Sequence, residues 1–417
     1  MNIKMCVAPD AVSRWENIDF KTAEESVKKL QQRIAKAYSH RCFDKVATLQ
    51  NKLIHSFYAK ALAVNVVASS KGRYTSGIDS KLLDNSNDKY LMISDLRRRG
   101  YKPLPLKRIY IPKANGKMRP ISIPTMKDRA MQTLYKFTLE PIAELTADDC
   151  SFSFRPKRSC RNAISRCEDI LLHNPKMEWI LKADIKSCFD NISHKWILDN
   201  IPMDKIILEK FLKCGFIERD DYHKTECGVP QGGCLSTVIC NMTLDGLEGL
   251  LFEKFRKSVR IVRYADDIVI FGVDKTLLVQ SVLPLVKQFL AERGLTLSDE
   301  KTEITYIKNG FTFLGWKVYK SNNQVFSVPS DKNIKSLLEK IEGILKGDLP
   351  RSCEDTCKKL NALIRGWLSY YANIAVKQSL YGVEFDVCTL VHSLTDDKRI
   401  VDFVQNLFND FDKKYIN

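Results

Sequence analysis

The stretch Ile261-Val262-Arg263-Tyr264-Ala265-Asp266-Asp267-Ile268-Val269-Ile270-Phe271 decides the fold, because two adjacent acids interrupt a run of β-forming residues. β-branched and aromatic residues favour strands, and Asp is common in tight turns. The pattern therefore predicts two strands joined by a turn that carries both carboxylates. Taken alone, an Asp-Asp turn also fits two ordinary turn acids.

A second apolar run, Ile180-Leu181-Lys182-Ala183-Asp184, also ends in an acid. A carboxylate at the end of a strand can project into a cleft rather than into the core. Phosphoryl transfer to a 3′ hydroxyl needs metal ions, and Mg²⁺ prefers hard oxygen ligands. We therefore expect Asp184, Asp266 and Asp267 to be the catalytic residues and to hold two Mg²⁺ ions, with Mn²⁺ as the alternative ion.

A third segment, Pro230-Gln231-Gly232-Gly233, precedes an apolar stretch of helical spacing. Glycines let the backbone approach a base pair closely, and the Gln231 amide can donate a hydrogen bond to a nucleotide or a template base. The alternative is an ordinary loop before a helix.

These segments and five others resemble the motifs of the reverse transcriptases of the group II intron type, and they occur in the order in which that family has them. The others are Ile111 to Ile121, Phe152 to Ser159, Phe189 to Ile192, Leu297 to Thr302 and Phe313 to Trp316. The resemblance covers roughly residues 15 to 375. It implies an α/β (α+β) right-hand polymerase with fingers, a palm and a helical thumb, preceded by a helical N-terminal extension.

The expected domains are the N-terminal extension over residues 1–80, the fingers and palm over 81–327, and the thumb with an acidic C-terminal segment over 328–417. Apolar residues at helical spacing predict one helix over about 21–38 and another over about 43–67. Two β-rich runs flanking a Lys113-to-Lys117 turn predict a hairpin.

The resemblance also assigns roles to individual residues. It implies a metal-binding set of Asp184, Ile185, Asp266 and Asp267. The nucleotide-binding residues would be Lys107, Arg119, Phe189, Gln231 and Lys301; the primer grip would be Phe313, Leu314, Gly315 and Trp316; and RNA would contact Arg155, Lys157 and Arg158. An aromatic ring at Phe189 would clash with a ribose 2′ hydroxyl and so select dNTPs. The alternative is that Phe189 is only a core residue.

Composition agrees with a polyanionic partner. The chain has 66 Lys and Arg against 50 Asp and Glu, a formal charge of +16, which favours nucleic acid, although a basic surface can also serve solubility alone. No apolar run approaches the ~18 residues that span a bilayer, so we expect a cytoplasmic protein without membrane contact. The 13 cysteines include no Cys-x-x-Cys and are expected to be reduced thiols; Cys353 and Cys357 would lie one helical turn apart.

The expected partners are an RNA template, dNTPs and the cDNA product. From Gln378 to Asn417 there are seven acidic and four basic residues, and an acidic surface is poorly suited to binding target DNA. This composition favours an enzyme that copies a dedicated noncoding RNA in bacterial antiviral defence. The alternative is a group II intron maturase and reverse transcriptase that acts in splicing and mobility.

Overall fold

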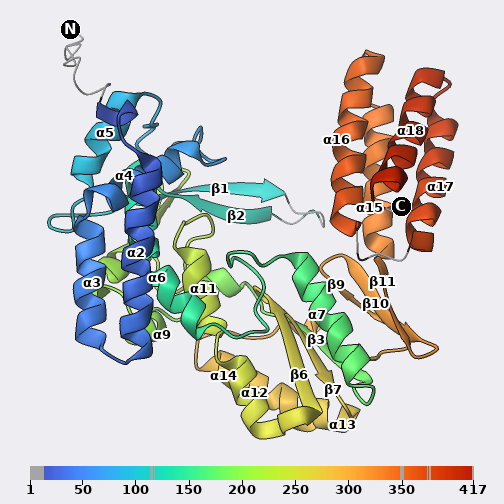
Figure 1. The fold of residues 1–417 in the computed structure, drawn as a ribbon, viewed down its shortest axis with the longest axis horizontal. Coiled ribbons are helices and arrows are strands. Elements are labelled where there is room, and N and C mark those ends of the chain that lie inside the picture. Colours follow the sequence, from blue (N-terminus) through green and yellow to red (C-terminus); the bar gives the residue numbers. More distant parts are fainter. Residues whose placement is uncertain are drawn as a thin grey trace. The chain divides into compact units, whose positions relative to one another are not determined.

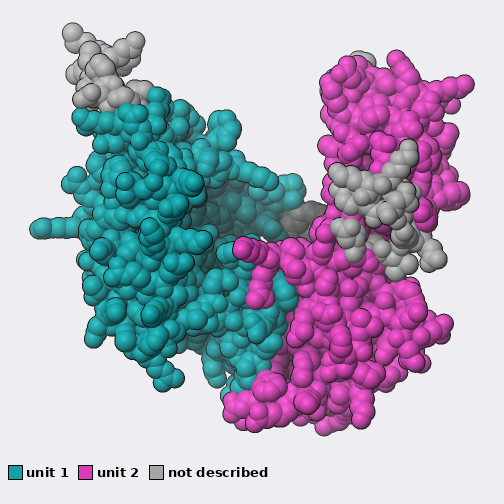
Figure 2. Space-filling model, viewed as in Figure 1, with its two compact units in different colours: residues 1–156, 185–250, 284–298 teal, residues 157–184, 251–283, 299–417 magenta. Residues whose placement is uncertain are grey.

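The computed structural model describes residues 14–112, 116, 118–347, 352–372, 374 and 377–415. They form two compact units, one of residues 1–156, 185–250 and 284–298 and one of residues 157–184, 251–283 and 299–417 (Figure 2). Helices make up 57% and strands 16% of the chain, which confirms the predicted α+β class. No described helix is both long enough and apolar enough to cross a membrane. The predicted domain boundaries stay a prediction.

The N-terminal part of the first unit is helical, and α2, α3 and α4 all contact α6 (Figure 1). This part includes α2 (Phe20–Ser39), α3 (Phe43–His55), α4 (Phe57–Ser69), α5 (Ser86–Asp95) and α6 (Met126–Thr146). α2 confirms the predicted helix. The single helix predicted over 43–67 is wrong, because Ser56 has extended backbone angles and its hydroxyl caps α4 by accepting a hydrogen bond from the Ala59 amide.

The predicted hairpin is present as β1 (Leu106–Pro112) and β2 (Met118–Ile123), which pair antiparallel. β1 also pairs in parallel with β4 (Phe216–Glu218), and β5 (Asp221–His223) completes a sheet of order β2-β1-β4-β5. Residues 113–115 and 117 of the predicted Lys113-to-Lys117 turn lie outside the described residues. The first unit also contains α8 (Cys188–Asn191), α9 (His194–Asn200), α10 (Lys205–Leu212) and α11 (Ser236–Leu244). Two further helices, α12 (Leu247–Phe255) and α14 (Leu283–Ala291), span the unit boundaries.

The palm sheet lies in the second unit and has the order β6-β7-β3-β8. Its strands β3, β6 and β7 are labelled in Figure 1. Its strands are β3 (Trp179–Asp184), β6 (Val259–Tyr264), β7 (Asp267–Gly272) and β8 (Glu303–Tyr306). Helix α7 (Cys160–His173) packs on β6. Ile180, Val269 and Phe271 are fully buried, so the apolar runs that flank the acids form the core of the sheet.

A second sheet, of order β11-β10-β9, follows in the same unit. It consists of β9 (Phe311–Phe313), β10 (Trp316–Ser321) and β11 (Gln324–Pro329). The chain then forms four helices: α15 (Asp331–Leu345), α16 (Cys353–Tyr371), α17 (Lys377–Leu394) and α18 (Lys398–Tyr415). Cys353 and Cys357 lie one turn apart on α16 as predicted, with their sulfurs 4.0 Å from each other.

Candidate active site

The three aspartates lie at one end of the palm sheet. β3 and β7 pair antiparallel in a register that sets Asp184 opposite Asp267, and the β6–β7 pairing sets Tyr264 opposite Asp267. Ala265 and Asp266 make the intervening turn, where Ala265 adopts a left-handed φ of 55°. The strand-turn-strand prediction is confirmed, and the register brings two acids together that are 83 positions apart in the sequence.

Crowding of negative charge dominates the electrostatics of these carboxylates. Burial, together with the charges of Asp266 and Asp184, raises the pKa of Asp267 to about 6. The Lys301 ammonium donates a hydrogen bond of 2.8 Å to Asp184 Oδ2, and this bond raises the pKa of Lys301. Repulsion between carboxylates held by a paired backbone is relieved by a cation, and in this structure the Lys301 ammonium is such a cation.

These residues fit a divalent metal ion in their chemistry. Carboxylates are the oxygen donors that Mg²⁺ prefers, and two or three suffice because water and phosphate complete its shell. Across the described residues, no three Asp, Glu, His or Cys side chains already surround a common metal position. The side chains would therefore reorient around the ion. Ile185, the other predicted ligand, is buried and bridges to Leu297.

The loop that contains Pro230 and Gln231 packs against the segment that follows Asp184. The Gly228 amide donates to the Ile192 carbonyl at 2.7 Å, and the Val229 amide donates to the Phe189 carbonyl at 2.6 Å. Gly228 has a φ of 80°, and a Cβ there would lie 2.5 Å from the Asp190 carbonyl oxygen. Only glycine permits this approach, so the loop and the Phe189 turn form one structural element.

Gln231 joins this element to the β2-β1-β4-β5 sheet. Its carbonyl accepts from the Ser122 amide of β2 at 2.8 Å, while its side-chain amide donates to Asp190 Oδ2 at 3.0 Å. The amide predicted to contact a nucleotide is thus bound to a carboxylate in this structure. Asp190 is a positioning residue that the sequence reasoning did not single out, because the pairing needs the folded loop.

Phe189 is half-buried and has an aromatic neighbour. Its ring lies edge-to-face against Phe154, with centroids 6.4 Å apart and planes at 86°. Phe154 is 53% exposed and has a left-handed φ of 55°, so its ring is not simply core. The sequence alone did not indicate that Phe154 touches Phe189.

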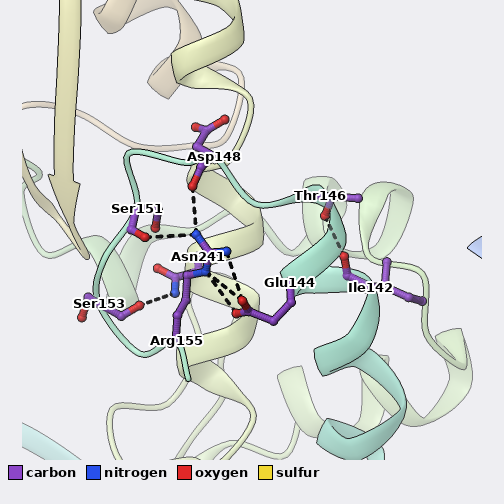
Figure 3. Close-up of polar contacts among 8 residues, drawn as sticks. All are labelled: Ile142, Glu144, Thr146, Asp148, Ser151, Ser153, Arg155 and Asn241. Atoms are coloured by element: carbon purple, nitrogen blue, oxygen red, sulfur yellow. Dashed lines mark hydrogen bonds and ion pairs between the residues drawn. The ribbon is translucent and has the colours of Figure 1, made fainter. Parts of the chain in front are cut away.

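The Arg155 guanidinium is held by the protein in this geometry, and its predicted contact with RNA stays a prediction. Its guanidinium donates to both Glu144 carboxylate oxygens at 3.0 to 3.2 Å and to the carbonyls of Asp148 and Ser151 at 2.9 and 3.0 Å (Figure 3). Its side chain is only 6% exposed. Every terminal nitrogen is committed to the protein, so little of the group is left for phosphate.

The other predicted basic residues are more accessible. Lys107 and Arg119 are exposed on β1 and β2, respectively, and Lys157 is exposed in the loop before α7. Arg158 is half-buried. Their predicted contacts with triphosphate and RNA stay predictions.

The predicted primer grip is the turn between β9 and β10, and it is fixed by the helix α16. Leu314 and Gly315 have positive φ values of 50° and 84°. The Tyr370 hydroxyl donates to the Leu314 carbonyl at 2.7 Å, and the Tyr371 hydroxyl donates to the Gly315 carbonyl at 2.8 Å. Phe313 and Trp316 are buried, so they hold the turn, and the backbone of Leu314 and Gly315 forms its tip.

Comparison with protein families gives three matches in chain order. Residues 111–318 match the family described as reverse transcriptase, RNA-dependent DNA polymerase. The chain contains a reverse transcriptase domain. Residues 15–96 match the N-terminal domain of reverse transcriptase, and residues 334–384 match the maturase-specific domain of group II introns. These matches confirm the predicted enzyme class of the domain and the palm fold.

Proteins with similar sequences include intron-encoded ones. The chain is 37% identical over 195 residues to the group II intron-encoded protein LtrA of Lactococcus lactis, covering 44% of this chain and 32% of LtrA. It is 27% identical over 344 residues to a putative COX1/OXI3 intron 2 protein of Saccharomyces cerevisiae, covering 67% of this chain and 40% of that protein. The chain thus spans less than half the length of these two relatives.

A third relative is closer in length. Protein YkfC of Escherichia coli is 27% identical over 322 residues, which cover 65% of this chain and 84% of YkfC. Among solved structures, apo telomerase from Candida tropicalis matches with a TM-score of 0.45 and 14% identity, covering 76% of this chain and 67% of that chain.

Proposed function

We propose that this protein is an RNA-directed DNA polymerase that copies an RNA template into cDNA from dNTPs, with Asp184, Asp266 and Asp267 holding two Mg²⁺ ions. The observation that carries the proposal is the β3–β7 register, which sets Asp184 opposite Asp267 beside the Asp266 turn. Three acids gathered at a sheet end are costly without a cation. The reverse transcriptase family match over 111–318 supports the reaction type.

The bound Mg²⁺ ions would activate the primer 3′ hydroxyl and neutralise the triphosphate and the leaving pyrophosphate. The strand pairing keeps Asp184 and Asp267 adjacent throughout the cycle. The Lys301 ammonium, which is hydrogen-bonded to Asp184 in this structure, would be displaced from that carboxylate by a bound ion. It would then turn toward the triphosphate and contribute a positive charge there. Asp190 orients the Gln231 amide, which is thereby held beside Phe189 for contact with the incoming nucleotide.

Sugar selection would depend on Phe189. A ring at this position excludes a 2′ hydroxyl by steric contact, which is typically worth a few kcal/mol, or roughly a hundredfold in specificity. Phe154 supports the ring from its edge. This pair supports dNTPs as the substrate.

A basic groove in the N-terminal helices supports the binding of a folded RNA. It has a volume of about 750 Å³ and is lined by α2, α3 and α4, and the lining includes Glu25 as its one acid beside Lys29, Arg33, Lys52, His55 and Tyr58. Cations with an adjacent aromatic ring suit phosphate contact and base stacking. Binding would weaken steeply with salt because each neutralised phosphate releases counterions.

Two kinds of RNA are candidates for the template. The maturase-specific match over 334–384 favours a group II intron RNA. The acidic composition from Gln378 onward, seven acids against four bases, motivates the other candidate, a dedicated noncoding RNA copied in antiviral defence. The family match is the more specific observation, so we place the intron RNA first and keep the defence role as the second hypothesis.

The test has two parts. The purified protein should extend a primer on an RNA template with dNTPs, and Asp266→Asn should abolish extension while RNA affinity is nearly unchanged. Sequencing of RNA and cDNA recovered with the protein from its host then separates the templates: an intron with flanking exons supports the first, and a compact noncoding RNA with its cDNA supports the second. Extension by Asp266→Asn at a large fraction of the unmodified rate would refute the metal assignment.

A further inference from the structure

A polybasic cavity lies in the first unit, between helix α4 and the turn after α5. It has a volume of about 320 Å³, which is within the range of small-ligand sites. Its lining includes five basic residues and no acid: His55, Lys60, Arg97, Arg98 and Arg99. These residues are distinct from the palm carboxylates and from the residues proposed to bind the incoming nucleotide.

The cations of this cavity are poorly compensated. Arg98 is paired with Asp204, which does not line the cavity. Arg97 donates through Nε to the Ser94 carbonyl at 2.6 Å, which brings no negative charge. Burial and the nearby charge of Arg97 lower the pKa of Lys60. A bound anion would offset the repulsion between Lys60 and Arg97.

The floor of the cavity is apolar. It consists of Ile54, Leu96, Met131, Leu134 and Tyr135, each less than a tenth exposed. Tyr135 is 2% exposed, and its buried hydroxyl has no hydrogen-bond partner among the described residues. An apolar floor under a cationic rim matches a ligand that is flat and apolar at one end and polyanionic at the other. A nucleoside di- or triphosphate group has this character, and arginine forks match phosphate oxygens well.

We propose that this cavity binds the polyphosphate and base of a nucleotide, at a site separate from the polymerase centre. The nucleotide is either free or the 5′-triphosphorylated end of an RNA, because both present the same group. Arg97, Arg99 and Lys60 contact the phosphates, and the base lies on the Leu96 and Met131 side. Arg98 stays with Asp204.

The experiment measures equilibrium binding to the full-length chain without divalent ions and in the Asp267→Asn background, so that the catalytic site does not contribute. The probes are ATP, inorganic triphosphate, and one RNA oligonucleotide with either a 5′ triphosphate or a 5′ hydroxyl. The test variant is Arg97→Gln with Arg99→Gln. The matched control is Lys81→Gln with Lys224→Gln, which removes the same charge from exposed positions that line no described cavity.

We expect at least a tenfold loss of affinity in the test variant, with less than a twofold change in the control. A loss for ATP identifies a free nucleotide as the ligand, and a loss confined to the 5′-triphosphate RNA identifies an RNA end. Equal affinity for ATP and inorganic triphosphate overturns the role of the apolar floor. Equal losses of affinity in the test variant and the control variant overturn the proposed site. The site is also overturned if the protein does not bind ATP and does not prefer the 5′-triphosphate RNA over the 5′-hydroxyl RNA. Primer extension by the protein that retains Asp267 tests the polymerase separately. The Arg97→Gln and Arg99→Gln changes should leave this activity intact.

Discussion

Phe154 presents its ring edge-to-face to Phe189, with the centroids 6.4 Å apart. Edge-to-face contacts add about 0.5 to 1.5 kcal/mol beyond the area that they bury. The loop that carries Phe154 is itself anchored, because the Asn241 side chain donates to the Ser153 carbonyl at 2.7 Å (Figure 3). Phe154 is therefore placed to restrict the rotamers of Phe189.

Phe154→Ala should weaken sugar discrimination without removing it. The contact energy predicts about a threefold to tenfold fall in the ratio of kcat/KM for dNTP to that for rNTP. Phe189→Ala should lower the same ratio by on the order of a hundredfold. Phe154→Tyr keeps the ring edge and is the matched control. An unchanged ratio in Phe154→Ala, beside a clear loss in Phe189→Ala, would show that Phe154 does not position the ring.

Asp267→Asn should stabilise the metal-free protein while it abolishes polymerisation. The pKa of Asp267 is raised to about 6 from the ordinary value of 3.8, so the folded state binds this proton more tightly than the unfolded state does. The ionised carboxylate then costs stability above about pH 6, and this cost disappears as the pH falls toward 4. The gain at pH 8 should approach about 3 kcal/mol.

Thermal unfolding in EDTA at pH 5 and pH 8 checks this prediction. The difference between the unmodified protein and Asp267→Asn should be larger at pH 8. Added Mg²⁺ should raise the Tm of the unmodified protein and have a much smaller effect on the variant. Lower stability of the variant at pH 8 would contradict the charge repulsion argued here.

Much of the palm could be predicted from the sequence because its strands and turns depend on short sequence patterns. Apolar β runs broken by acids predicted β3, β6 and β7, with Asp184 at a strand end and Asp266 and Asp267 in a turn, since strand propensity and turn chemistry act over a few residues. In the structure, Asp267 is the first residue of β7. The break at Ser56 was missed because residues on both sides continue the helical spacing, and only the capping geometry separates α3 from α4.

The contacts between distant segments were not predictable in this way. In the sequence, nothing distinguishes Arg155 from the neighbouring basic residues. In the folded protein, Glu144, Asp148 and Ser151 surround its guanidinium. The Gln231–Asp190 hydrogen bond likewise depends on the close approach at Gly228. The residue type indicates the charge of a side chain, but its burial and its hydrogen-bond partners in the folded protein determine what the side chain contacts.

Lys301→Met should tighten Mg²⁺ binding in the absence of nucleotide. The Lys301 ammonium lies 2.8 Å from Asp184 Oδ2 and competes with a metal ion for that oxygen. Because the lysine is 63% exposed, the ion pair is worth about 0.2 to 1 kcal/mol, which predicts a gain in affinity of roughly 1.4-fold to fivefold. Titration calorimetry measures this change, and Lys301→Arg, which keeps the charge, should show no gain. The KM for dNTP should rise in Lys301→Met. Weaker Mg²⁺ binding in this variant would mean that the lysine supports the metal site instead of competing for it.

Arg155→Lys should destabilise the first unit even though it keeps the charge. A lysine cannot reproduce the fork that joins both Glu144 oxygens to the Asp148 and Ser151 carbonyls. Because the Glu144 side chain is 38% exposed, the lost hydrogen bonds cost about 1 to 3 kcal/mol. Denaturant unfolding measures this loss, with Lys157→Arg at a nearby exposed position as the control. RNA affinity separates the two roles proposed for Arg155. If the guanidinium gripped phosphate, Arg155→Lys would retain most of the binding and stability, whereas a structural clamp predicts a loss of stability with nearly unchanged RNA affinity below the unfolding transition.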